Sequence, residues 1–69
     1  MTQNEYEKEV KKTFIKYTNL PDDEVNEYFM TETVQSLLKN NYEGYVKAGN
    51  GPKRGYSVDA TANCLDMMY

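Results

Sequence analysis

The chain has no covalent or metal cross-link available to stabilise a fold, and this limits what it can form. Its 69 residues include no histidine and a single cysteine, Cys64. One cysteine cannot form an internal disulfide, and no cluster of metal-ligating residues takes its place. A chain of this length buries only about 60% of the surface that its unfolded form exposes. The fold therefore depends on close packing of secondary structure or on association with another chain.

The same absences argue against catalysis. Without histidine there is no imidazole general base with a pKa near neutral pH, and no Ser–His or Cys–His pair. We therefore expect a binding protein and not an enzyme, with no cofactor and no metal. Hydrophobic residues make up 39% of the chain and charged residues 28%, which is typical of a globular protein. The length predicts a single domain over residues 1–69.

The start of the chain does not resemble a targeting segment. The first seven residues are acidic and polar, whereas a signal peptide has a basic start and an apolar run. No stretch approaches the roughly 18 consecutive apolar residues of a membrane span. A lone thiol is also suited to a reducing compartment. These features predict a cytoplasmic protein that does not enter a membrane.

The first helix is predicted over residues 3–18. Thr2 and Glu5 have the spacing of a capping box, in which each residue accepts a backbone hydrogen bond from the other. Apolar and small residues recur at helical spacing on one face, and three Glu–Lys pairs follow on the other. Ile15 lies opposite this stripe, either exposed or in contact with another helix. The stripe predicts core positions at Tyr6, Val10, Thr13, Phe14 and Tyr17.

A reversal in the hydrophobic pattern predicts a break between two further helices. Pro21 disfavours helix in the residue before it, and Asp22 can cap a second helix. The apolar face of that helix, at Val25, Tyr28 and Phe29, points roughly opposite to the apolar set that follows it. We therefore expect a break near Met30 and Thr31, with Thr31 capping a third helix. The alternative is one long helix packed on both sides. The second apolar set comprises Val34, Leu37, Leu38, Tyr42 and Tyr45.

The third helix is expected to end by Lys47 or Ala48, with Gly49 as its stop. Ser57 then caps a fourth helix that runs to the end of the sequence, and its apolar arc is unusually wide. Cys64 lies on this arc and is expected to be buried. The predicted fold is an all-α bundle of three to four short helices. A hairpin over residues 45–58 is the alternative that Asn50-Gly51 favours, although the proline and glycines of this connection oppose a tight turn.

The glycine-rich loop over residues 49–55 does not match a phosphate-binding motif. It contains no Gly-Lys-Ser/Thr sequence and misses the dinucleotide pattern G-x-G-x-x-G by one position. We interpret it as a helix stop followed by a loop. The alternative is contact with an anionic partner through Lys47, Lys53 and Arg54.

Charge and tyrosine content favour binding to another protein. Residues 19–33 contain five acidic residues and no lysine or arginine, and such a segment can meet a basic surface. Seven tyrosines are present, and tyrosine is enriched at interfaces. The wide apolar arc of the fourth helix further suggests contact with a partner or with a second copy in a homodimer. The candidate partner-binding residues are Asp22, Asp23, Glu27, Tyr45, Tyr56, Met67, Met68 and Tyr69.

A DNA-binding regulator is the alternative function. The second and third predicted helices could form a helix-turn-helix, in which Gln35, Ser36 and Lys39 face DNA. The net charge of −3 opposes nucleic-acid binding, the first helix of the pair is strongly acidic, and the usual turn glycine is absent. The sequence therefore favours a small acidic protein–protein interaction module.

Overall fold

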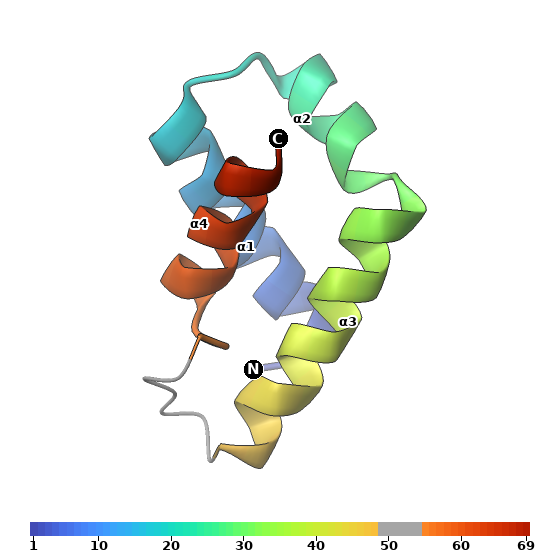
Figure 1. Ribbon diagram of the computed structural model, residues 1–69, viewed down its shortest axis with the longest axis vertical. Coiled ribbons are helices and arrows are strands. Elements are labelled where there is room, and N and C mark those ends of the chain that lie inside the picture. Colours follow the sequence, from blue (N-terminus) through green and yellow to red (C-terminus); the bar gives the residue numbers. More distant parts are fainter. Residues whose placement is uncertain (49–54) are drawn as a thin grey trace.

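In the computed structural model of the protein, residues 1–48 and 55–69 are described. They form the helices α1 (Gln3–Thr18), α2 (Asp22–Phe29), α3 (Glu32–Lys47) and α4 (Val58–Met68), with no strand within these residues (Figure 1). The predicted all-α bundle is confirmed. The hairpin alternative is wrong, because Tyr45 to Lys47 belong to the last turn of α3, and Tyr56 and Ser57 lead into α4. Gly49, Asn50-Gly51 and most of the glycine-rich loop lie outside the described residues.

Helix α1 begins and ends as its local sequence predicts. The Thr2 hydroxyl accepts a hydrogen bond from the Glu5 amide at 3.2 Å, and the Glu5 carboxylate accepts one from the Thr2 amide at 2.8 Å. The hydrogen bond from the Thr2 amide lowers the pKa of the Glu5 carboxyl group. At the other end Asn19 adopts a left-handed conformation with φ of 59°, which asparagine tolerates better than most residues. Of the three predicted Glu–Lys pairs, Glu9 and Lys12 form an ion pair at 3.6 Å.

Helix α2 begins at Asp22, one residue before the start that a cap at Asp22 would give. Pro21 occupies the N-cap position, with no side-chain cap, and Asp22 is the first helical residue. Asp22 as a cap is therefore wrong. The fixed φ of proline, here −65°, already suits entry into a helix. Asp22, Asp23 and Glu24 instead lie in the first turn, where the helix dipole favours negative charge.

The break between α2 and α3 is confirmed, and Thr31 forms it. Its hydroxyl donates to the Tyr28 carbonyl of α2 at 2.8 Å and accepts from the Val34 amide of α3 at 3.4 Å. One side chain therefore satisfies a carbonyl at the end of one helix and an amide at the start of the next. The Gln35 side chain also donates to the Phe29 carbonyl at 2.5 Å.

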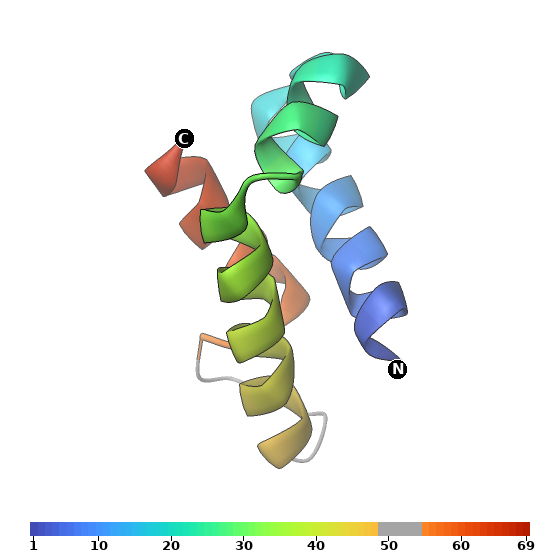
Figure 2. The same cartoon turned by 90° about the vertical axis from the view of Figure 1, so that its right-hand side faces the viewer.

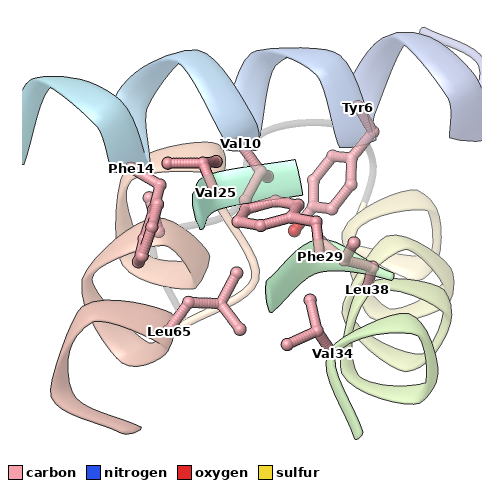
Figure 3. Close-up of a cluster of buried hydrophobic side chains, with 9 residues drawn as sticks. Tyr6, Val10, Phe14, Val25, Phe29, Val34, Leu38 and Leu65 are labelled. Atoms are coloured by element: carbon pink, nitrogen blue, oxygen red, sulfur yellow. The ribbon is translucent and has the colours of Figure 1, made fainter. Parts of the chain in front are cut away.

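All four helices contribute to one hydrophobic core. Figure 3 shows the buried side chains pointing toward one another from every helix, and the rings of Phe14 and Phe29 meet edge to face at 5.3 Å. Helix α4 packs mainly along α1, and α3 crosses this pair, with α1 on one side of it and α4 on the other in Figure 2. The core comprises Tyr6, Val10, Phe14, Val25, Phe29, Val34, Leu38, Ala62 and Leu65.

Tyr17 and Cys64 are less buried than expected, and the structure decides the environment of Ile15. Tyr17 is 50% exposed, because Tyr69 at the end of α4 lies against Phe14 and Tyr17 is nearly one turn further along α1. Cys64 is half-buried and not enclosed, since α4 buries only Thr61, Ala62 and Leu65. Ile15, whose environment the sequence left open, is half-buried and packs against the core.

Candidate functional site

The structure divides the candidate residues between two ends of the bundle. The predicted cap Ser57 is confirmed, and α4 then runs 11 residues, or about 16 Å, from the end of α3 toward α2 (Figure 1). Tyr45 and Tyr56 lie at the start of α4. Met67, Met68 and Tyr69 lie at its other end. The structure therefore does not bring these five residues onto one surface, because the whole of α4 separates them.

At the first end, the tyrosines surround a buried polar network. The Tyr6 hydroxyl donates to the Tyr56 carbonyl at 2.6 Å and lies 2.7 Å from the Thr61 hydroxyl, which accepts from the Asn41 amide group at 3.0 Å. Tyr6 and Thr61 have no exposed surface. These bonds connect α1, α3, α4 and the segment that leads into α4. We name Tyr6, Asn41, Tyr45, Tyr56 and Thr61 the Tyr6 cluster.

The two candidate tyrosines of the Tyr6 cluster support the fold. The Tyr45 ring is half-buried and lies 5.2 Å from the Tyr6 ring. The Tyr56 ring covers Gly44 so closely that a Cβ on Gly44 would lie 2.8 Å from it. Gly44 therefore allows the ring to pack on α3, which explains a glycine inside that helix. Tyr56 remains 39% exposed, so only its outer edge is available to a partner.

At the second end, a shallow notch of about 300 Å³ lies between α2 and the end of α4. The Tyr28 and Tyr69 rings meet there with centroids 4.8 Å apart and planes at 78°. The Tyr28 hydroxyl donates to the Leu65 carbonyl at 2.8 Å, and the Tyr69 hydroxyl donates to Glu24 Oε2. We name this feature the α2–α4 notch; it is lined by Glu24, Glu27, Tyr28, Thr31 and Tyr69.

The α2–α4 notch is electrostatically negative. The hydrogen bond to Glu24 raises the pKa of Tyr69 above its ordinary value of 10.0, and the charges of Glu24 and Glu27 raise it further. Burial raises the pKa of Tyr28, with a further contribution from the charge of Asp66. Over residues 1–48 and 55–69 the only salt bridge joins Lys12 and Glu9. No lysine or arginine of these residues therefore forms an ion pair with a carboxylate of α2, although Lys11 contacts Asn26 of the same helix.

The other candidate residues on α2 and at the end of α4 do not line the notch. Asp23 precedes Glu27 by one helical turn on the same side of α2, whereas Asp22 lies roughly 140° around the helix from Glu27. Met67 is 81% exposed and projects away from the buried face of α4. Met68 is 46% exposed, and its sulfur lies 4.0 Å from the Cys64 sulfur. Of the eight candidates, Glu27 and Tyr69 line the notch.

Three residues of the notch were not among the candidate binding residues. Glu24 was counted only among the five acidic residues of positions 19–33, Tyr28 was expected on an apolar helix face, and Thr31 was expected as a cap. Glu24, Glu27 and Tyr28 occupy positions i, i+3 and i+4 on one face of α2, and Thr31 follows at the break. The sequence contains this spacing. It does not show that these residues lie beside Tyr69, because that contact depends on how α4 packs.

A second hollow, of about 360 Å³, lies between α1 and the junction of α2 with α3. Here the Lys11 ammonium donates to the Asn26 side chain, and Phe29 and Met30 supply apolar surface. Its polar residues include Glu7 as well as Lys8 and Lys11, so its charges are mixed. This hollow shows no preference for a ligand of either sign.

The described residues limit other kinds of site. Within residues 1–48 and 55–69, no three histidine, cysteine, aspartate or glutamate side chains are close enough to bind a metal ion together. No helix in this part of the chain combines the length and the apolar character needed to cross a bilayer.

The helix-turn-helix alternative loses one of its three predicted DNA-facing residues. The Gln35 side chain is engaged by the Phe29 carbonyl and so stabilises the junction of α2 and α3. Ser36 and Lys39 are exposed on α3, but the neighbouring α2 carries four acidic residues that phosphates would repel.

We compared the chain with models of protein families, with curated proteins and with solved structures, and none of the three comparisons found a match.

Proposed function

We propose that this chain is a small, acidic, non-catalytic protein–protein interaction module that acts in the cytoplasm by occupying a basic surface of a partner. The observation that carries the proposal is the α2–α4 notch. It combines two carboxylates that form no ion pair among the described residues with a tyrosine that is 54% exposed. Exposed aromatic surface and unpaired charge of one sign are typical of surfaces that recognise another protein.

The charges of α2 supply the test. Immobilised wild-type protein is exposed to a lysate of the source cells beside two variants that each lose two negative charges. Asp23→Asn/Glu27→Gln alters the acidic face of α2, and Glu7→Gln/Glu43→Gln is the matched control on α1 and α3. We expect one partner that the wild type and the control retain and the α2 variant loses, with all three proteins equally helical by circular dichroism.

Other results would contradict this function. Equal retention of every bound protein by the three forms would show that the acidic face of α2 is not used. Salt-sensitive binding to DNA fragments would favour the regulator alternative, with Ser36 and Lys39 as the residues to test. A dimer in analytical ultracentrifugation that the α2 variant abolishes would identify a second copy of the chain as the partner.

A further inference from the structure

The α2–α4 notch has the chemistry of a receptor for one type of side chain. Its two carboxylates, on Glu24 and Glu27, lie one turn apart on α2, and two tyrosine rings that meet at 78° also line it. A cation near the face of a tyrosine ring is attracted by the negative charge of that face. The notch therefore favours a group that is both positively charged and able to lie against an aromatic ring.

We propose that the α2–α4 notch receives an arginine side chain of the partner, with the guanidinium against the Tyr69 ring and hydrogen-bonded to Glu24 and Glu27. This inference rests on the proposed function and specifies the chemistry of the partner at that site. Arginine fits because its guanidinium is planar, stacks on aromatic rings and presents several N–H donors to carboxylates. A lysine ammonium supplies the charge without the planar contact.

The existing hydrogen bonds leave room for this contact. Tyr69 donates to Oε2 of Glu24, so the other carboxylate oxygen of Glu24 can still accept from an arginine. The Tyr28 hydroxyl is directed to the Leu65 carbonyl, which fixes this ring against α4. The Tyr69 hydroxyl, whose pKa is raised above its ordinary value of 10.0, is protonated at neutral pH and so can donate to Glu24.

Competing ligands fit the notch less well. A metal ion lacks a set of three ligands among the described residues. An anion would be repelled by Glu24 and Glu27. The hollow beside Lys11 has mixed charge and does not select a cation. The ligand that fits is therefore an organic cation with a flat face. In a protein partner, the arginine side chain is such a group.

The test uses blocked tripeptides as probes of the full chain, followed by nuclear magnetic resonance. The peptides are acetyl-Gly-Arg-Gly-amide, the same peptide with lysine, and the same peptide with citrulline, which has the shape of arginine without its charge. We expect the arginine peptide to shift the resonances of the five notch residues with a millimolar Kd, since the contacts are exposed. We expect weaker binding of lysine and none of citrulline.

Variants locate the binding. Glu24→Gln/Glu27→Gln should weaken arginine-peptide binding by about three- to tenfold, whereas the control Glu7→Gln/Glu43→Gln should leave it within about twofold. Tyr69→Ala should abolish binding, and Tyr69→Phe should preserve it because the ring remains and Glu24 is released. Equal binding of citrulline, equal weakening by the control, or no shift of notch residues would overturn the proposal.

A third variant separates this inference from the proposed function. Asp22→Asn/Asp23→Asn changes α2 charge outside the notch. If a captured partner is lost only with Glu24→Gln/Glu27→Gln, both proposals are supported. If it is lost only with Asp22→Asn/Asp23→Asn, the protein still binds a partner through α2, but the arginine notch is wrong. If it is lost with neither variant, the notch does not recognise the partner.

Discussion

Tyr6 and Tyr69 lie at opposite ends of the bundle and use the same side chain for different purposes. Tyr6 has no exposed surface, and its hydroxyl contacts a backbone carbonyl and the Thr61 hydroxyl. Tyr69 is 54% exposed, and its hydroxyl donates to an exposed carboxylate. A buried phenol has to be hydrogen-bonded within the protein, whereas an exposed one can exchange that bond for water. The Tyr6 cluster therefore stabilises the fold, whereas the hydroxyl at the α2–α4 notch lies at the surface, where we propose that a partner binds.

The largest expected difference in stability is between the variants that remove the ring of Tyr6 and the ring of Tyr69. Tyr6→Ala should lower the free energy of unfolding by about 3–5 kcal/mol, because it leaves a cavity and unpaired partners. The total for a chain of this size is about 3–10 kcal/mol, so this variant should be largely unfolded. Tyr69→Ala should cost about 1 kcal/mol, since half of its surface is already in water. Urea unfolding followed by circular dichroism measures both values, and similar costs would contradict the comparison.

Removing only the hydroxyl groups gives a smaller and sharper contrast. Tyr6→Phe should cost about 1–3 kcal/mol, because the buried Thr61 hydroxyl and Tyr56 carbonyl lose a partner. Tyr69→Phe should change stability by no more than about 0.5 kcal/mol. In a double-mutant cycle, Tyr6→Phe with Thr61→Val should cost less than the sum of the single changes. Strict additivity would show that the two hydroxyls do not interact.

The junction between α2 and α3 borders the α2–α4 notch at Thr31. Thr31→Ala removes a donor to the Tyr28 carbonyl and an acceptor for the Val34 amide, so it should cost about 0.5–2 kcal/mol. Thr33→Ala, an exposed position in the first turn of α3, should change stability by less than about 0.5 kcal/mol. Equal effects in urea unfolding would mean that the cap contributes no more than an ordinary surface residue.

The helix boundaries could be predicted because the signals for them are local. The Thr2–Glu5 capping box, the Thr31 cap and the Ser57 cap each involve residues three apart, and all three form as expected. The reversal of the apolar face between Phe29 and Val34 is also a local pattern. Asp22 was misassigned because Pro21 fits the same position without a side-chain hydrogen bond.

The candidate site could be predicted only in part, because it depends on tertiary packing. The acidic character of α2 and the exposure of Tyr69 follow from composition and pattern. Nothing local indicates that Tyr69 meets Glu24, 45 residues away in sequence, or that Tyr56 packs on Gly44. These contacts arise because α4 lies along α1 and spans the bundle, so its two ends meet different helices.

Alkaline pH should further distinguish the contributions of Tyr6 and Tyr69 to the free energy of unfolding. Burial raises the pKa of Tyr6 above its ordinary value of 10.0, which the unfolded chain would show. The stabilising contribution of neutral Tyr6 is therefore complete below about pH 10 and is lost as pH rises through its folded pKa. Urea unfolding between pH 8 and about pH 11 should show a loss of stability that Tyr6→Phe reduces more than Tyr69→Phe does. A steeper loss in Tyr6→Phe than in the wild type would contradict this assignment.

The smallest effect is expected at Cys64, on the side of α4 between the two regions. Its thiol is half-buried beside Met68, so Cys64→Ser should cost less than about 1 kcal/mol. A thiol reagent should modify native Cys64 faster than the protein unfolds, but more slowly than in denaturant. If modification is instead limited by global unfolding, Cys64 is enclosed and the serine variant should be clearly destabilised.

An arginine peptide bound in the α2–α4 notch should not slow the reaction of Cys64 with the thiol reagent, because Cys64 does not line the notch. A folded partner that covers the end of α4 should slow it, so the same thiol measures how far the interface extends beyond the notch.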